Sequence, residues 1–122
     1  MSNKALVAGV DMVKFAKPGA NDPYEVMASR AIQGALNDAG LQLTDIQQAY
    51  ASYVYGDSAC GQKSIYELGL PGFPIFNVNN NCSSGSSALF LARQAVESGQ
   101  VECALAFGFD AMLKGALKST WH

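Results

Sequence analysis

The chain has 122 residues, 49% of them hydrophobic, and a formal net charge of −2. This length suits one domain with a core. Only 15% of the residues are charged and no run of lysine and arginine is present, which argues against a nucleic-acid-binding surface. No apolar stretch reaches the roughly 18 residues of a membrane-spanning helix, and the start lacks the apolar region of a signal peptide. We therefore expect a soluble intracellular protein with no nucleic-acid partner.

The cysteines are three in number and widely spaced: Cys60, Cys82 and Cys103. No CxxC pair is present, and the one histidine is the terminal His122. This pattern predicts neither a metal site nor a disulfide framework. Three free thiols are typical of a reducing compartment.

The first half of the chain predicts a strand, a loop, a helix and a single turn. The strand covers residues 4–10 and the turn residues 44–46. Between them, Asp22 is the expected N-cap, Pro23 the first helical residue, and Glu25 the partner that completes a capping box. Apolar residues follow at a spacing of three and four, and Gly40 is expected to end the helix.

The second half predicts three strands separated by two helices. The strands cover residues 48–55, 75–78 and 103–109, and the last is almost wholly apolar, so we expect it at the centre of the sheet. A short helix is expected over 62–68, after a polar loop over 56–61. A longer helix follows Cys82 and ends at Gly99; its wide apolar face predicts deep burial. Residues 110–122 show no clear pattern. Alternating strands and helices indicate an α/β layered fold with a parallel sheet.

Cys82 stands where the third strand turns into the longer helix. Asparagines 79–81 can end the strand sharply, and Ser83 or Ser84 can cap the helix. A thiol at a helix N-terminus faces unpaired N–H groups, which favour the thiolate, the nucleophilic form. The alternative is that Cys82 is a small buried hydrophobe. Its small polar neighbours favour the nucleophile, and the carboxyl ends of parallel strands are where such sheets bind ligands.

Three stretches of the chain resemble one family. They are residues 77–86 (NVNNNCSSGS), 55–62 (YGDSACGQ) and 106–112 (AFGFDAM), and the opening 7–15 (VAGVDMVKF) agrees with them. Together they resemble the N-terminal part of a thiolase, and most closely the sterol carrier protein X or lipid-transfer-protein type. The resemblance runs from about residue 6 to about residue 115.

The resemblance implies a thiolase-like layered fold, of which residues 1–122 would form a partial N-terminal half in the order β-α-β-α-β-α-β. It implies that Cys82 accepts the acyl group of a 3-oxoacyl-CoA in lipid or sterol side-chain metabolism, with its backbone N–H in an oxyanion hole. Coenzyme A thioester is then a substrate, and no bound cofactor is expected. The family's histidine motifs, second cysteine and coenzyme A-binding loop domain are not in these 122 residues, so we expect the chain alone to be inactive.

The resemblance also implies a homodimer and a cytoplasmic or peroxisomal location. Candidate residues lining the site are Asn81, Ser83, Gly85 and Cys60. Cys60 could instead simply fill space, and the asparagines could be turn residues only. Two other functions stay open: a thiolase-like retro-aldolase acting on sterol side chains, and a non-catalytic truncated fragment.

Overall fold

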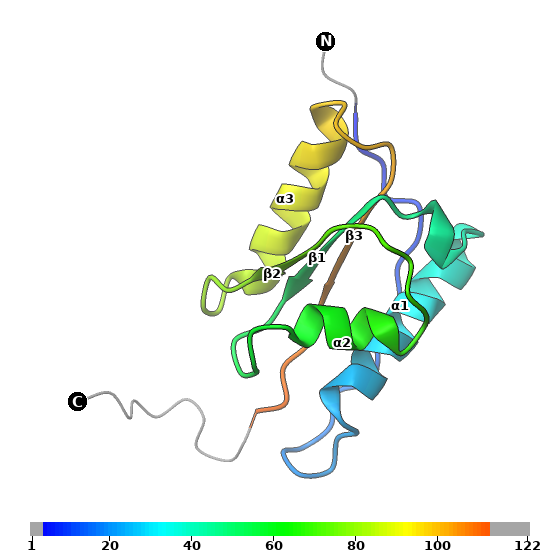
Figure 1. Ribbon diagram of the computed structural model, residues 1–122. Helices are drawn as coiled ribbons and strands as arrows, with labels where there is room; N and C mark the ends of the chain where they lie inside the picture. Colours follow the sequence, from blue (N-terminus) through cyan, green and yellow to red (C-terminus); the bar gives the residue numbers. More distant parts are fainter. Residues whose placement is uncertain (1–3, 113–122) are drawn as a thin grey trace.

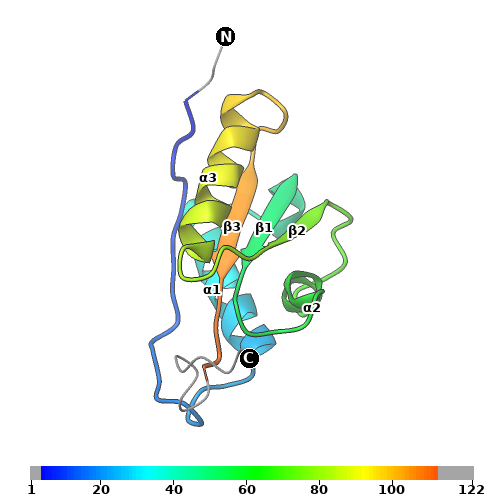
Figure 2. The same ribbon diagram turned by 90° about the vertical axis from the view of Figure 1, so that its left-hand side faces the viewer.

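The computed structural model describes residues 4–112, which form three layers, α/β/α (Figure 1). The central layer is a parallel sheet of β1 (Gln48–Ser52), β2 (Ile75–Val78) and β3 (Ala104–Gly108), in the order β2-β1-β3. Helix α3 (Ser84–Glu97) covers one face, and α1 (Tyr24–Ala39) and α2 (Cys60–Tyr66) lie against the other (Figures 1 and 2). The predicted α/β class is confirmed.

Side chains of the central strand alternate between two cores. Ala49 and Ala51 are fully buried against the α1 side, whereas Tyr50 faces the α3 side. Ile32 of α1 and Ile65 of α2 are the largest fully buried apolar side chains of the first core. The second core is built mainly from alanines of α3, so this helix lies close to the sheet.

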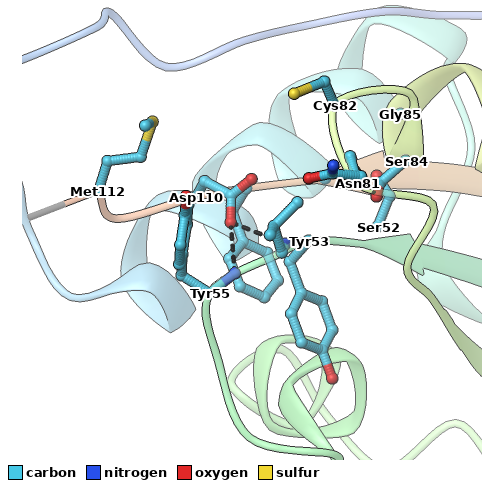
Figure 3. Close-up of a pocket in the computed structure, with 12 residues that line it drawn as sticks. Ser52, Tyr53, Tyr55, Asn81, Cys82, Ser84, Gly85, Asp110 and Met112 are labelled. Atoms are coloured by element: carbon cyan, nitrogen blue, oxygen red, sulfur yellow. Dashed lines mark hydrogen bonds between the residues drawn. The ribbon is translucent and has the colours of Figure 1, made fainter. Parts of the chain in front are cut away.

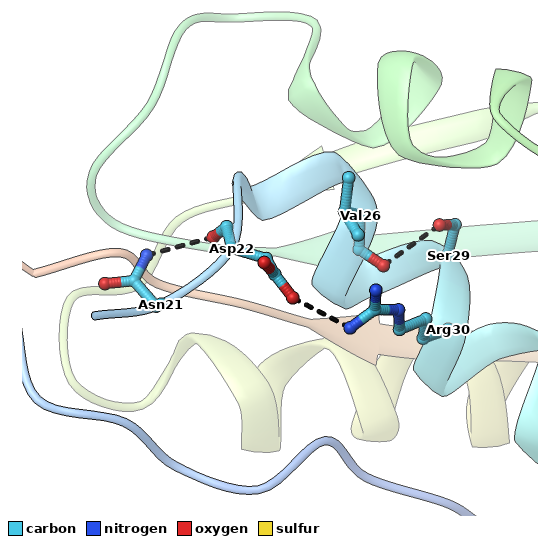
Figure 4. A network of polar contacts seen from close by, with 5 residues as sticks. All are labelled: Asn21, Asp22, Val26, Ser29 and Arg30. Carbon is cyan, nitrogen blue, oxygen red and sulfur yellow. Dashed lines mark hydrogen bonds and ion pairs between the residues drawn. The ribbon is translucent and has the colours of Figure 1, made fainter. Parts of the chain in front are cut away.

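Helix α1 begins one residue later than predicted, and without the predicted capping box. Pro23 is the N-cap, no side chain caps the helix, and the Pro23 carbonyl accepts the first helical N–H bonds. The Asp22 carboxylate instead pairs with Arg30 of the same helix, at 2.7 Å (Figure 4). The predicted end is confirmed: Gly40 takes a φ of 70°, a left-handed conformation that glycine adopts without a steric penalty.

The predicted first strand over residues 4–10 is wrong. This segment is irregular and runs along the side of α3 and α1 (Figure 2). Its N–H groups at Ala5 and Val10 donate to the carboxylates of Glu97 and Asp38. A strand needs a neighbouring strand for its backbone bonds, and within the described residues this segment pairs with none.

Several element boundaries also differ from the predictions. The turn predicted over residues 44–46 is a 3₁₀ turn over Leu43–Asp45. Strand β1, predicted to end at residue 55, ends at Ser52. Helix α2, predicted to start at residue 62, starts at Cys60. The strand predicted over 103–109 covers 104–108 and lies at an edge of the three described strands, while β1 is central, so its predicted central position is wrong. The strand over 75–78 is confirmed to the residue. Residues 113–122, the end of the segment without a pattern, lie outside the described residues.

The predicted deep burial of α3 is wrong for its outer side. Ala88, Ala92 and Ala95 are buried, but Leu89 and Phe90 are 60% and 61% exposed. The alanine stripe and the half-buried Leu91 pack on the sheet side, whereas Leu89 and Phe90 occupy the outer side of the helix. No helix in the part of the chain that the structure describes is long and apolar enough to cross a bilayer.

Candidate active site

Cys82 lies between the carboxyl end of β2 and the first turn of α3, as the sequence predicts. The thiol is exposed, whereas Cys60 is 2% exposed and Cys103 is intermediate. The interpretation of Cys82 as a buried hydrophobe is therefore wrong. Figure 3 shows its sulfur projecting away from Ser84 and Gly85, toward the side on which Asp110 and Met112 lie.

A cavity of about 300 Å³ opens beside Cys82 (Figure 3). Residues from three segments line it, each at or just beyond the carboxyl end of a strand: 52–55 at the end of β1, 81–85 after β2, and 108–112 at the end of β3. Parallel strands place these ends at one edge of the sheet, which is where α/β folds bind ligands. The lining residues are Ser52, Tyr53, Val54, Tyr55, Asn81, Cys82, Ser84, Gly85, Gly108, Phe109, Asp110 and Met112.

The turn that carries Cys82 is held by a dense set of hydrogen bonds. Asn81 has a φ of 52°, the left-handed backbone that asparagine tolerates better than most residues. Its N–H donates to the Asn79 side chain, and its carbonyl accepts from the N–H and the hydroxyl of Ser84. The Ser84 hydroxyl also accepts the Asn80 N–H at 2.8 Å. These bonds fix the backbone conformation of the turn that carries the exposed Cys82 thiol.

The opposite wall of the cavity is tied together by Asp110. One of its carboxylate oxygens accepts the N–H groups of Val54 and Tyr55, at 2.9 and 3.0 Å. The neighbouring Phe109 ring is stacked between Tyr24 and Tyr53, with ring centroids 4.7 and 5.0 Å away. The segment after β3 is thereby fastened to the segment after β1, so that this side of the cavity has a fixed shape.

Cys60 and Ser83 do not line the cavity, although the sequence makes them candidates. Cys60 begins α2 and is buried beside Tyr24 and Tyr53. Burial and the bond to the Cys60 thiol raise the pKa of the Tyr24 hydroxyl. Ser83 occupies the N-cap position of α3, but its exposed hydroxyl turns back to donate to the Asn80 carbonyl. Asn81 and Gly85, the other two candidates, do line the cavity beside Cys82.

The residues after β1 and β3 are missed by the sequence reasoning. The sequence does contain a signal for them, because the strands predicted over 48–55 and 103–109 end at the same edge of a parallel sheet as the strand before Cys82. Applying the carboxyl-end rule to all three strands finds Asp110. Ser84 is considered from the sequence only as a possible helix cap, because its contacts with the backbone of Asn80 and Asn81 depend on the fold of the turn. Within the described residues, no group of three or more histidine, cysteine or carboxylate side chains could hold a metal ion.

Comparison with known proteins agrees with this arrangement. Residues 6–119 match the family model "Thiolase, N-terminal domain". The chain is 54% identical to sterol carrier protein 2 of Gallus gallus over 98% of its own length and 22% of the relative's. It is 47% identical to the non-specific lipid-transfer protein-like 2 of Caenorhabditis elegans, covering 95% of the chain and 29% of that protein.

Among solved structures, acetyl-CoA acetyltransferase from Syntrophomonas wolfei superposes with a TM-score of 0.70 at 20% identity, over 87% of this chain and 28% of that one. This likeness confirms the thiolase-like fold. The chain spans less than a third of the length of each of these proteins. From the match of residues 6–119 to the N-terminal domain model, we conclude that the chain belongs to the thiolase family.

Proposed function

We propose that this chain supplies the acyl-accepting cysteine of a thiolase-type acyltransferase acting on 3-oxoacyl-CoA thioesters. The observation that carries the proposal is the exposed Cys82 thiol, on a hydrogen-bonded turn at the mouth of a cavity, in a member of the thiolase family. The sterol carrier and lipid-transfer names of the relatives support lipid or sterol side-chain metabolism as the setting.

In this proposal the Cys82 sulfur attacks the 3-oxo carbon of the substrate. A bond forms between sulfur and that carbon, and the bond between carbons 2 and 3 breaks. The departing carbanion takes a proton and leaves as the shorter thioester. The Cys82 N–H stabilises negative charge on the carbonyl oxygen, the role of a preorganised donor at developing charge. Asn81 and Gly85 border the place where the acyl group would lie.

We further propose that residues 1–122 alone accept an acyl group but do not turn over. Delivery of a proton by a positioned acid or base typically contributes 10² to 10⁴-fold. In the thiolases that this chain resembles, that group belongs to the C-terminal half of the protein, and the coenzyme A-binding loop domain is not among these 122 residues. The chain spans 22% of the length of the Gallus gallus relative, which supports the assignment of these functions to other segments.

The test is incubation of the purified chain with an acyl-CoA, followed by intact-mass and peptide mass spectrometry. We expect one acyl group on Cys82, formed by transfer from coenzyme A, which leaves as the free thiol. Cys82→Ala should abolish the adduct and Cys103→Ala should keep it. Absence of an adduct on a Cys82 that still reacts with iodoacetamide contradicts the acyl-acceptor role. Repeated cleavage of acetoacetyl-CoA contradicts the proposed inactivity of the chain alone.

Two finer features are part of the same proposal. The whole enzyme is a homodimer, in keeping with the family, and it acts in the cytoplasm or the peroxisome. Exposed apolar side chains on the described surface, among them Leu89 and Phe90, are suited to such association.

A further inference from the structure

We infer that Ser84 is a positioning residue that orients the Cys82 N–H for oxyanion stabilisation, a role that rests on the proposed acyl transfer. Ser84 is 4% exposed, a degree of burial unusual for serine. It lies at the start of α3, two residues after the proposed nucleophile. Its hydroxyl makes two hydrogen bonds to the backbone of the preceding turn, one with the Asn80 N–H and one with the Asn81 carbonyl.

The Ser84 hydroxyl is hydrogen-bonded to the backbone of two consecutive residues of the turn. As an acceptor it takes the Asn80 N–H at 2.8 Å, and as a donor it reaches the Asn81 carbonyl at 2.7 Å. The Ser84 N–H donates to the same carbonyl at 3.1 Å. The Asn81 carbonyl is therefore held by two donors from one residue, while the residue that carries it has a φ of 52°.

Peptide planarity links this contact to the chemistry. The Asn81 carbonyl and the Cys82 N–H belong to the same peptide group, and no peptide bond in the described chain is cis. In a planar trans peptide the N–H points opposite to the C=O. Fixing the carbonyl toward Ser84 thus directs the Cys82 N–H away from Ser84. This is the donor that the proposed function assigns to the developing oxyanion.

The neighbouring serines do not share this position. Ser83 is exposed, and both its N–H and its hydroxyl donate to the Asn80 carbonyl. Ser87 binds the Asn80 side chain, at 2.9 Å, and leaves the backbone of the turn untouched. Ser87→Ala is therefore a matched control, because it removes a hydroxyl from the same helix and from the same asparagine without altering the peptide that precedes Cys82.

The test compares two reactions of Cys82 in the 122-residue chain. Transfer from an acyl-CoA passes through an oxyanion, whereas alkylation by iodoacetamide displaces iodide and forms none. We expect Ser84→Ala to slow acylation roughly ten- to a hundredfold, the order of effect that misplacement of catalytic geometry produces, and to slow alkylation much less. Ser84→Thr, which keeps the hydroxyl, should restore acylation, and Ser87→Ala should acylate like the unmodified chain.

Equal slowing of both reactions, or none, overturns the inference, and so does failure of Ser84→Thr to exceed Ser84→Ala. Amide hydrogen exchange gives a second measurement that needs no variant: the Asn80 N–H should be protected in the unmodified chain, and free exchange there overturns the proposed contact. If the unmodified chain is not acylated at all, the proposed function fails, while protection of Asn80 still decides whether Ser84 holds the turn. The two failures are thus distinguishable.

Discussion

Asp110 Oδ1 accepts the N–H of Val54 at 2.9 Å, although the two residues are 56 positions apart. The same oxygen accepts the Tyr55 N–H. One carboxylate therefore fastens the segment after β3 to the segment after β1, and both segments line the cavity beside Cys82.

Removing this carboxylate should loosen the cavity wall. Hydrogen bonds to a charged group contribute more than neutral ones, but these are exposed to water, so we expect Asp110→Ala to lower the free energy of unfolding by about 1 kcal/mol. Asp110→Asn keeps an acceptor oxygen and should lower the free energy of unfolding by a smaller amount. Urea unfolding measures both, and exchange of the Val54 and Tyr55 amides should quicken in the alanine variant. Unchanged exchange at both amides would contradict the bracing role.

The three thiols should react in the order of their accessibility. Cys82 is exposed, Cys103 is intermediate and Cys60 is buried. Burial raises the pKa of the Cys103 thiol, and the Asp45 carboxylate raises it further, so less thiolate is available there. We expect iodoacetamide to label Cys82 first and Cys60 last. Labelling in denaturant serves as the control, since the order should then disappear. Native labelling of Cys103 ahead of Cys82 would contradict the assignment.

Glycines at the starts of two helices should respond oppositely to alanine. A Cβ at Gly61 would lie 2.5 Å from the Asn77 side-chain oxygen and 2.6 Å from the Ala51 Cβ. We expect Gly61→Ala to destabilise by about 1–3 kcal/mol, because overpacking at such a site forces the backbone to shift. A Cβ at Gly85 meets nothing within 4 Å, so Gly85→Ala should be neutral or stabilising. Thermal unfolding of the two variants makes the comparison, and equal melting temperatures would contradict it.

Stability should fall in alkaline solution. Burial raises the pKa of the Tyr53 hydroxyl, and the pKa of Cys103 is raised as well. Above about pH 8.5 for a thiol and about pH 10 for a tyrosine, the unfolded chain releases protons that the folded chain retains. The unfolded state then binds fewer protons, so the free energy of unfolding decreases as pH rises. Urea titrations from pH 7 to 10 measure this, and Cys103→Ala should flatten the decline. A stability that increases across this range would show that the sign is wrong.

The outer side of α3 should promote association of this chain. Leu89 and Phe90 are each about 60% exposed there, and exposed apolar patches seek partners. Sedimentation velocity at micromolar concentration should detect species larger than a monomer. The double variant Leu89→Lys, Phe90→Lys should shift the distribution toward monomer, whereas Gln94→Lys, which adds charge without removing apolar surface, should not. A monodisperse monomer for the unmodified chain would refute the prediction.

The sequence alone was sufficient for the α/β class, for β2 and for the place of Cys82. Each depends on local chemistry: Pro74 and Asn79 bracket a short apolar strand, and the small polar residues after it permit a turn into a helix. Gly40 likewise ends α1 because glycine adopts its left-handed conformation freely.

Only the tertiary structure decided what depends on contacts between distant segments. Strand order puts apolar β3 at an edge of the described sheet, since hydrophobicity reports burial and not neighbours. Residues 4–10 have strand-like composition but pair with no described strand, and backbone pairing is a property of two segments. Asp110 and Ser84 acquire their roles in the same way, because each acts on backbone groups that only the folded chain brings within reach.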